Sequence, residues 1–149
     1  MVHATIQHSE FSHAYKVVAS DLNQYGIMHG GRLLTLCDEA GYISARKHDN
    51  HGCLTRAVHQ ARFHRAVEQG DNLTFCARVG LTGHSSLWVF VEVISGEDAQ
   101  CIMDAVFVFA AIDEQLKIRH VPAVRAENDA EKKLQARLKR MRDQVLEQG

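Results

Sequence analysis

The sequence predicts an α+β domain in which one buried helix is followed by an antiparallel sheet. Two observations carry this prediction. Residues 31–47 place apolar side chains almost all round a helix, which is typical of a helix buried by the rest of the fold. After Gly52, several segments alternate apolar and polar residues with the period of two that marks β-strands.

Three strands are expected in the second half of the chain, each with a continuous apolar face. These faces contain Leu73, Phe75, Ala77, Val79 and Leu81; Leu87, Val89, Val91 and Val93; and Val106, Val108, Ala110 and Ile112. Turn residues at 83–84 and 96–98 separate the strands. The opposite faces also carry large apolar side chains such as Trp88 and Phe109, so the sheet needs cover on both sides. One helix covers one face, and a second subunit or further strands would cover the other.

Length and composition favour a single domain. The chain has 149 residues, 46% of them hydrophobic, and a formal charge of −1, which excludes nonspecific nucleic-acid binding through bulk charge. Residues 1–19 lack the apolar run of a signal peptide, and the uncharged apolar run 105–112 is too short to span a bilayer. The four cysteines have no metal-binding spacing, so we expect reduced thiols, no metal site and a cytoplasmic protein.

The end of the chain changes in composition. We place a boundary after Pro122, with a domain over residues 1–122 and a charged helical extension over residues 123–149. The extension carries a narrow apolar stripe formed by Leu134, Leu138, Met141 and Val145. The sequence slightly favours a solvated helical tail, and docking of the stripe on a neighbouring subunit is the alternative.

The segment that leads into the predicted buried helix carries the candidate chemistry. Residues 21–41 read DLNQYGIMHGG and then RLLTLCDEAG. The glycine pair Gly30 and Gly31 leaves backbone N–H groups free at the positive end of the helix. Asp38 lies further along on a face that is otherwise apolar or small, where a structural carboxylate is unexpected.

These residues, in this order, resemble the hotdog-fold acyl-CoA thioesterases of the cytosolic acyl-CoA hydrolase type. The family pattern is an asparagine, a glycine, a glycine pair and an acidic residue on the central helix. The similarity continues through ARFHRAVEQGD, LTGHSSLWVFVEV and AVFVFAAID, and so covers about residues 17–122. The resemblance implies a hotdog fold, in which an antiparallel sheet wraps around one long helix. It also implies that two sheets join edge to edge in a dimer, often with further assembly to a tetramer or hexamer.

Thioester hydrolysis needs an activated water or a carboxylate nucleophile, and a group that stabilises the oxyanion. Asp38 fits as general base or nucleophile, and the N–H groups of Gly30 and Gly31 fit as donors to the carbonyl oxygen. Asn23 fits as a hydrogen-bonding group that orients water or substrate. The resemblance implies that Asn23 and Asp38 are the catalytic pair, often contributed by different subunits.

Each of these residues also has a structural explanation. Asn23 is typical of an Asx-turn before Gly26, and an ion pair with Arg32 or another buried cation would account for Asp38. The glycine pair would allow close packing of the helix against the sheet. Glu39 lies on a different helix face, where an ordinary salt bridge or a dimer contact is the preferred interpretation.

The resemblance also implies contacts to coenzyme A. Arg65, Ser85 and Ser86 fall in stretches that lie near the coenzyme A groove of the family, and a hairpin turn with surface charge is the alternative. His84 stands where Arg or Lys is usual, which weakens a phosphate contact at neutral pH. His29 is expected to be a loop or substrate-contact residue, because the prolines that surround the catalytic histidine of hotdog dehydratases are absent here.

The sequence therefore predicts an acyl-CoA thioesterase that releases a free fatty acid and coenzyme A, with no cofactor beyond the coenzyme A of its own substrate. The expected partners are the acyl-CoA and further copies of the chain, with no nucleic acid and no membrane insertion. A noncatalytic acyl-CoA-binding hotdog module is one alternative. A hydratase or dehydratase that uses His29 is another. Release of a free thiol distinguishes the thioesterase from both.

Overall fold

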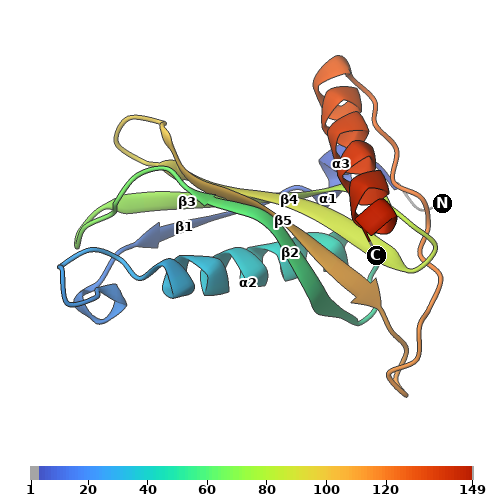
Figure 1. The fold of residues 1–149 in the computed structure, drawn as a ribbon, viewed down its shortest axis with the longest axis horizontal. Helices are drawn as coiled ribbons and strands as arrows, with labels where there is room; N and C mark the ends of the chain where they lie inside the picture. The colour runs from blue at the N-terminus through green and yellow to red at the C-terminus, as the bar shows by residue number, and fades with distance from the viewer. Residues whose placement is uncertain (1–3, 149) are drawn as a thin grey trace.

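The computed structural model describes residues 4–148 as a five-stranded antiparallel sheet with a long helix against each face (Figure 1). In chain order the elements are α1 (Ile6–Ser9), β1 (Phe11–Lys16), the 3-10 turn η1 (Ala19–Asp21), α2 (Gly30–His48), β2 (Cys53–Phe63), β3 (Asn72–Thr82), β4 (Ser86–Ser95), β5 (Cys101–Ala111) and α3 (Asp129–Gln148). The strand order is β1-β3-β4-β5-β2, and every neighbouring pair is antiparallel. The predicted combination of one central helix and an antiparallel sheet is confirmed.

The central helix α2 packs its small and apolar side chains onto one face of the sheet. It begins at the predicted glycine pair, with His29 at the N-cap, and ends at His48. Its buried residues include Leu33, Cys37 and Ala40, which join the main core. Gly41 allows a close approach, because a Cβ at this position would lie 3.3 Å from the ring of Phe109.

The outer face of α2 is not covered within one subunit. Tyr42 and Ile43 are 36% and 40% exposed, although the sequence predicts burial all round the helix. The edge strand β2 also exposes Leu54, Val58 and Phe63. Apolar side chains on a helix face and on the neighbouring sheet edge are typical of a surface that another subunit covers.

A β-bulge at Gly80 changes one predicted strand face. Val79 pairs with Val89, but Leu81 pairs with Trp88, so Gly80 is skipped in the register. The first four residues of the predicted face belong to the core beneath α2: Leu73, Phe75, Ala77 and Val79. Leu81 instead packs with Trp88 on the opposite side of the sheet. The prediction that Leu81 continues the first face is wrong, because one extra residue reverses the alternation of side chains.

The C-terminal helix α3 covers this second face. Leu134, Leu138 and Met141 are buried against a set of sheet residues formed by Leu81, Trp88, Phe90, Val106 and Val108. Gly80 permits this contact, because a Cβ there would approach Leu138 Cδ1 to 2.5 Å. The predicted helix is confirmed, and so is its apolar stripe at Leu134, Leu138 and Met141, whereas Val145 is exposed. The preference for a solvated tail is wrong. The reason is that this face of the sheet carries large apolar side chains, which need cover, and α3 of the same chain covers them.

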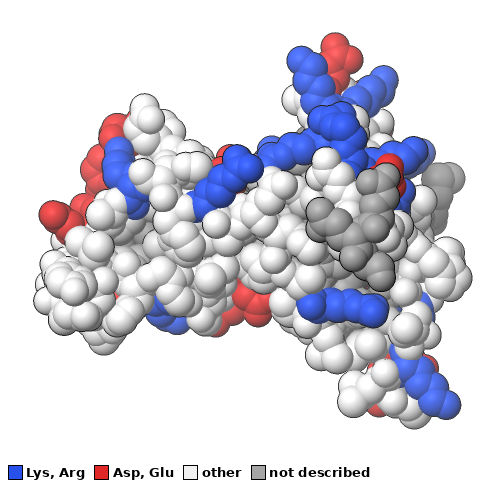
Figure 2. Space-filling view, in the orientation of Figure 1, with Lys and Arg blue, Asp and Glu red and all other residues white. Residues whose placement is uncertain are grey.

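The remaining surface of α3 is strongly charged. Figure 2 shows Lys and Arg side chains gathered on and beside α3, and acidic side chains at the far end of the molecule. Within residues 4–148, no helix combines the length and the apolarity that a membrane span requires. All four cysteines are free, as expected.

We expect Leu138→Ala to lower the free energy of unfolding by about 3 kcal/mol, because it leaves a cavity between α3 and the sheet. Val145→Ala is the matched control on the same helix, since Val145 is 36% exposed and Leu138 is fully buried. The control is expected to change stability by less than about 0.5 kcal/mol. Urea unfolding followed by the fluorescence of Trp88, which lies under α3, measures both. Equal effects of the two substitutions would contradict the docking of α3.

Candidate functional site

A buried carboxylate, Asp21, organises the loop that leads from β1 to α2. Its side chain is almost fully buried and accepts hydrogen bonds from Tyr15 Oη at 2.6 Å, from the N–H of Val18 at 3.0 Å and from Arg32 Nε at 3.0 Å. Its backbone carbonyl accepts from the N–H of His29 at 2.9 Å. Asp21 thereby ties β1, the loop and the first turn of α2 together.

These contacts determine the charge state of Asp21. Burial alone would raise the pKa of its carboxyl group, but the hydrogen bonds from Tyr15, Val18 and Arg32 outweigh burial and lower the pKa below its ordinary value of 3.8. The hydrogen bond to Asp21 raises the pKa of Tyr15. Because Arg32 pairs with Asp21, the ion pair with Arg32 that would have explained Asp38 is excluded.

The loop forms an Asx-turn at Asn23. The side-chain oxygen of Asn23 accepts hydrogen bonds from the N–H of Tyr25 at 2.9 Å and of Ile27 at 3.3 Å. Gly26 occupies the left-handed region with a φ of 77°, which glycine adopts without strain. The side-chain NH₂ of Asn23 donates to no residue within the described part of the chain. The Asx-turn expected for Asn23 is thus observed, and the side-chain NH₂ group of Asn23 stays available to donate a hydrogen bond.

Asn23 lines a hollow together with Gly30, Phe63 and Arg65. The N–H groups of Gly30 and Gly31 have no acceptor among residues 4–148, as expected for the first turn of a helix. A Cβ on Gly30 would lie 3.3 Å from the Phe63 ring, so the close-packing explanation holds for Gly30. It does not hold for Gly31, where a Cβ would meet nothing within 4 Å.

The neighbouring histidine, His29, is the N-cap residue of α2 and is exposed. Its carbonyl accepts the N–H groups of Arg32 and Leu33 at 3.1 Å each, while its side chain makes no capping hydrogen bond. The expectation of a loop residue is consistent with this position.

Asp38 lies about two turns further along α2. One carboxylate oxygen accepts a hydrogen bond of 2.5 Å from Thr55 Oγ1 on β2, and the other accepts none from the described residues. A second hollow beside Asp38 is lined by apolar groups of Tyr42, Ile43 and Leu54. Asp38 is therefore a half-buried carboxylate with one oxygen anchored and one oxygen free.

Glu39 borders the same hollow as Asp38. It is exposed, and it forms no ion pair with any residue in the range 4–148. The salt-bridge interpretation is therefore not observed, and the dimer contact stays a prediction.

One subunit does not bring Asn23 and Asp38 to the same hollow. The hollow that contains Asn23 and the hollow that contains Asp38 share no lining residue. Gly30 and Asp38 are eight positions apart on α2, which corresponds to about 12 Å along the helix axis. Within one subunit the two side chains therefore line separate hollows.

The predicted coenzyme A contacts also lie apart. Arg65 follows β2 and forms two hydrogen bonds to Asp98 in the β4–β5 turn, at 2.6 and 3.3 Å. The Arg65 guanidinium lowers the pKa of Asp98 to about 2. Ser85 lies in the β3–β4 turn and Ser86 begins β4, at the other end of the sheet (Figure 1). The hairpin explanation therefore describes the serines in one subunit, and no single groove contains all three residues.

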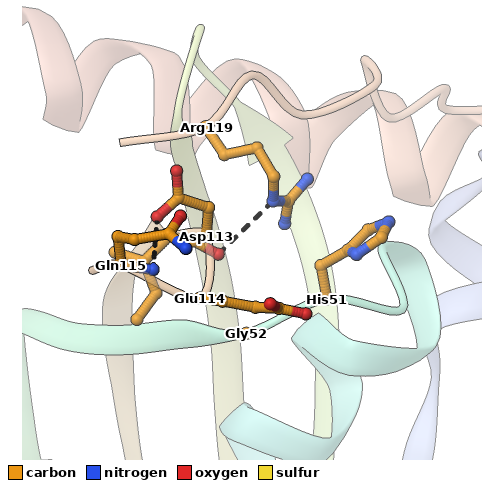
Figure 3. Close-up of a pocket in the computed structure, with 7 residues that line it drawn as sticks. His51, Gly52, Asp113, Glu114, Gln115 and Arg119 are labelled. Carbon is orange, nitrogen blue, oxygen red and sulfur yellow. Dashed lines mark hydrogen bonds between the residues drawn. The ribbon is translucent and has the colours of Figure 1, made fainter. Parts of the chain in front are cut away.

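A third hollow lies beyond the C-terminal end of α2 (Figure 3). Its wall includes His51, Asp113 and Arg119. Asp113 accepts the N–H groups of Gln115 at 2.8 Å and of Lys117 at 2.9 Å, which makes it a turn residue. Arg119 is held by Asp49 at 2.6 Å. These polar groups stabilise the loop after β5, and the hollow contains neither Asn23 nor Asp38.

Sequence reasoning missed two residues of the site. Thr55 is one of several small polar residues on an exposed strand, and nothing in the sequence shows that it faces Asp38. Asp21 lies in a loop, where acidic residues are usually solvated. Only the register of β2 beside α2 and the path of the loop reveal their roles.

Comparisons with known proteins define the class of the chain. The sequence model described as Thioesterase superfamily matches residues 25–102. A protein of Haemophilus influenzae named uncharacterized acyl-CoA thioester hydrolase is 30% identical over 110 residues, which are 69% of this chain and 71% of that protein. The chain belongs to the thioesterase superfamily.

Other relatives and solved structures support the same placement. The cytosolic acyl coenzyme A thioester hydrolase of Mus musculus is 28% identical over 139 residues, or 87% of this chain. The chain spans only about a third (35%) of the length of that relative. An acyl-CoA hydrolase of Staphylococcus aureus, solved with butyryl coenzyme A and coenzyme A, superposes with a TM-score of 0.86 at 27% identity and covers 97% of this chain and 93% of its own. The hotdog fold and the resemblance to acyl-CoA thioesterases are confirmed.

We expect Asp21→Asn to destabilise the fold by about 2 kcal/mol at neutral pH, because charge-assisted hydrogen bonds inside the loop are weakened. The lowered pKa means that the carboxylate contributes fully above pH 3.8 and loses its contribution as the pH falls through the folded-state pKa. Chemical unfolding of both proteins from pH 7 to pH 3 measures this. The difference between wild type and variant should shrink at the acid end.

Asp98→Asn is the matched control, because the Arg65–Asp98 pair is exposed where the Arg32–Asp21 pair has a buried carboxylate. We expect the control to change stability only slightly. Comparable losses for the two variants, or a loss at Asp21 that does not depend on pH, would contradict the role assigned to Asp21.

Proposed function

We propose that this chain is an acyl-CoA thioester hydrolase that cuts an acyl-CoA to a free fatty acid and coenzyme A. The observation that carries the proposal is Asp38, a carboxylate on the central helix with one oxygen held by Thr55 and the other free beside an apolar hollow. Proteins with this fold include the Staphylococcus aureus acyl-CoA hydrolase solved with butyryl coenzyme A. A cytoplasmic setting is proposed with it, since the mouse relative is named a cytosolic enzyme.

The spacing of three polar residues supports the assignment. The Staphylococcus aureus hydrolase has been solved as three single variants, in which an asparagine, an aspartate and a threonine are each replaced by alanine. The aspartate follows the asparagine by 15 positions, and the threonine follows the aspartate by 17. Asn23, Asp38 and Thr55 are separated by the same 15 and 17 positions. The correspondence includes Thr55, which is also the residue that donates to Asp38.

In the proposed reaction, the free oxygen of Asp38 takes a proton from a water that attacks the thioester carbonyl, and the coenzyme A thiolate leaves. In the alternative route, this oxygen attacks the carbonyl itself and expels the thiolate to form an anhydride, which water then hydrolyses to the free fatty acid and the Asp38 carboxylate. Thr55 fixes the carboxylate through the other oxygen. The coenzyme A thiolate is a good leaving group, so the reaction needs no strong acid. The apolar wall beside Asp38 accommodates the acyl chain.

The oxyanion is stabilised by the N–H groups of Gly30 and Gly31 at the positive end of α2, and Asn23 orients the water or substrate through its free NH₂ group. Because Asn23 and Gly30 line one hollow of a subunit and Asp38 lines another, we propose that the partner subunit completes each site. The apolar edge formed by Leu54, Val58 and Phe63 on β2 would then lie in the dimer contact.

The proposed contacts to coenzyme A are His29, Arg65, Ser85 and Ser86. Arg65 and the serines occupy opposite ends of one subunit's sheet, so a groove that contains both also needs two subunits. The hexameric thioesterase of Yersinia pestis, with a TM-score of 0.70 at 29% identity over 74% of this chain, supports an assembly of this kind.

We expect Asp38→Asn to reduce kcat for thiol release by on the order of 10²- to 10⁴-fold, because the general base or nucleophile is lost. Glu39→Gln is the matched control, since Glu39 is the adjacent acidic residue on the same hollow, and near wild-type turnover is expected. Thiol release from a panel of short- to long-chain acyl-CoAs measures both variants. Turnover that survives in Asp38→Asn would move the chemistry elsewhere, with His29 as the next residue to test. A wild type that binds acyl-CoA without releasing thiol would indicate a binding module.

A subunit-mixing experiment tests the shared site. Asn23→Ala and Asp38→Ala are each expected to be inactive alone. After subunit exchange, half of the dimers are mixed and carry one intact site, so about a quarter of wild-type activity should return. Native mass spectrometry confirms the exchange. Complete exchange without recovered activity would show that each subunit uses its own Asn23 and Asp38.

A further inference from the structure

Three side chains with different metal-binding atoms meet where β5 begins. They are the imidazole of His64, the thiol of Cys101 and the carboxylate of Asp104, whose ligand atoms all lie within 4.8 Å of one another. His64 Nε2 lies 3.0 Å from Asp104 Oδ2, and Cys101 Sγ lies 3.9 Å from the same oxygen. We propose that these three residues bind one zinc ion. The proposal does not depend on the hydrolase activity.

The fold brings these residues together through a β-bulge. Cys101 and Asp104 are three positions apart, so a regular strand would point them to opposite faces. The register pairs Ile94 with Cys101 and Val93 with Met103, which skips Ile102 and places Cys101 and Asp104 on one side.

The bulged residue also holds the third ligand. His64 follows the last residue of β2, and its N–H donates to the carbonyl of Ile102 at 2.8 Å. The backbone of His64 is therefore fixed against the bulge that positions Cys101 and Asp104. The cluster results from strand pairing and does not depend on a chance contact of long surface side chains.

The distances are close to those around a tetrahedral ion. Zinc binds nitrogen and carboxylate oxygen at about 2.0 Å and sulfur at about 2.3 Å, which places neighbouring ligand atoms about 3.3 to 3.6 Å apart. The observed nitrogen–oxygen and sulfur–oxygen separations are 3.0 and 3.9 Å, and all three ligand atoms lie within 4.8 Å of one another, so the side chains have to adjust for an ion to be bound. Three protein ligands leave the fourth position to water.

Charge and burial also favour a dication. Asp104 Oδ1 is buried and has no hydrogen-bond partner among residues 4–148, so a simple pair between His64 and Asp104 leaves it unexplained. One carboxylate and one thiolate together neutralise Zn²⁺. His64 is 41% exposed, which gives the ion a path from solvent. A nitrogen, sulfur and oxygen set selects zinc over magnesium or calcium, which prefer oxygen ligands.

The first test titrates the chelator-treated protein with Co²⁺ and then with Zn²⁺. We expect one ion per chain and a thiolate-to-cobalt charge-transfer band that zinc removes. Cys101→Ser should abolish the band, and His64→Ala and Asp104→Asn should weaken zinc binding at least about tenfold. Cys76→Ser is the matched control, because Cys76 is another half-buried free thiol outside the cluster, and its binding should equal that of wild type. A Cys101→Ser protein that keeps the band overturns the proposal.

The second test needs no variant, so it stands even where a substitution impairs folding. Alkylation of the wild-type chain is followed by mass spectrometry with and without zinc. Zinc should slow the modification of Cys101 at least about tenfold and leave Cys76 unchanged, because a bound thiolate is not available as a nucleophile. Equal rates at Cys101 with and without zinc, or equal protection of Cys101 and Cys76, overturn the proposal.

Discussion

The burial of α2 against the sheet is the constraint on which the rest of the structure depends. Gly41 brings the helix within contact of Phe109, and the helix axis then runs along the sheet with one face buried and one face open. Asp38 lies at the border between these faces, where Thr55 on the edge strand reaches its carboxylate. The same packing leaves Tyr42 and the apolar side chains of β2 without cover inside one subunit. The position of Asp38 beside Thr55 and the uncovered apolar surface both therefore result from the packing of α2 against the sheet.

The hydrogen bonds of the buried carboxylate of Asp21 fix the conformation of the loop between β1 and α2. Asp21 is buried, so it holds hydrogen-bond donors from three segments, and the loop between β1 and α2 takes one path. That path places Asn23 and Gly30, the first residue of α2, in the lining of the same hollow. Because Asp21 engages Arg32, no cation neutralises Asp38 from within its own helix. Asp21 is thus held in a network of hydrogen bonds, whereas Asp38 keeps one carboxylate oxygen without a hydrogen bond from the described residues.

Two irregularities in the strands add features that regular alternation would not produce. The bulge at Gly80 turns Leu81 toward α3 and, because glycine lacks a side chain, allows Leu138 to pack closely against the sheet. The bulge at Ile102 places Cys101 and Asp104 on one side, beside His64. In both cases one extra residue changes the face on which the following side chains lie.

The sequence by itself determined the periodic elements: the glycine-led apolar helix, the alternating strands, the amphipathic C-terminal helix and the candidates Asn23 and Asp38. The helices and strands follow from local spacing, because helical and extended backbones repeat with fixed periods. Asn23 and Asp38 became candidates through the resemblance to the thioesterase pattern, and the apolar surroundings of Asp38 on the helix supported the second of them. The tertiary structure alone decided that Leu134, Leu138 and Met141 dock on their own sheet, that Thr55 reaches Asp38, and that Arg65 lies far from Ser85. Register, bulges and the pairing of distant segments decide these contacts, and none of them leaves a local pattern in the sequence. The physical reason is that local spacing fixes which face a residue occupies, while only packing fixes what that face meets.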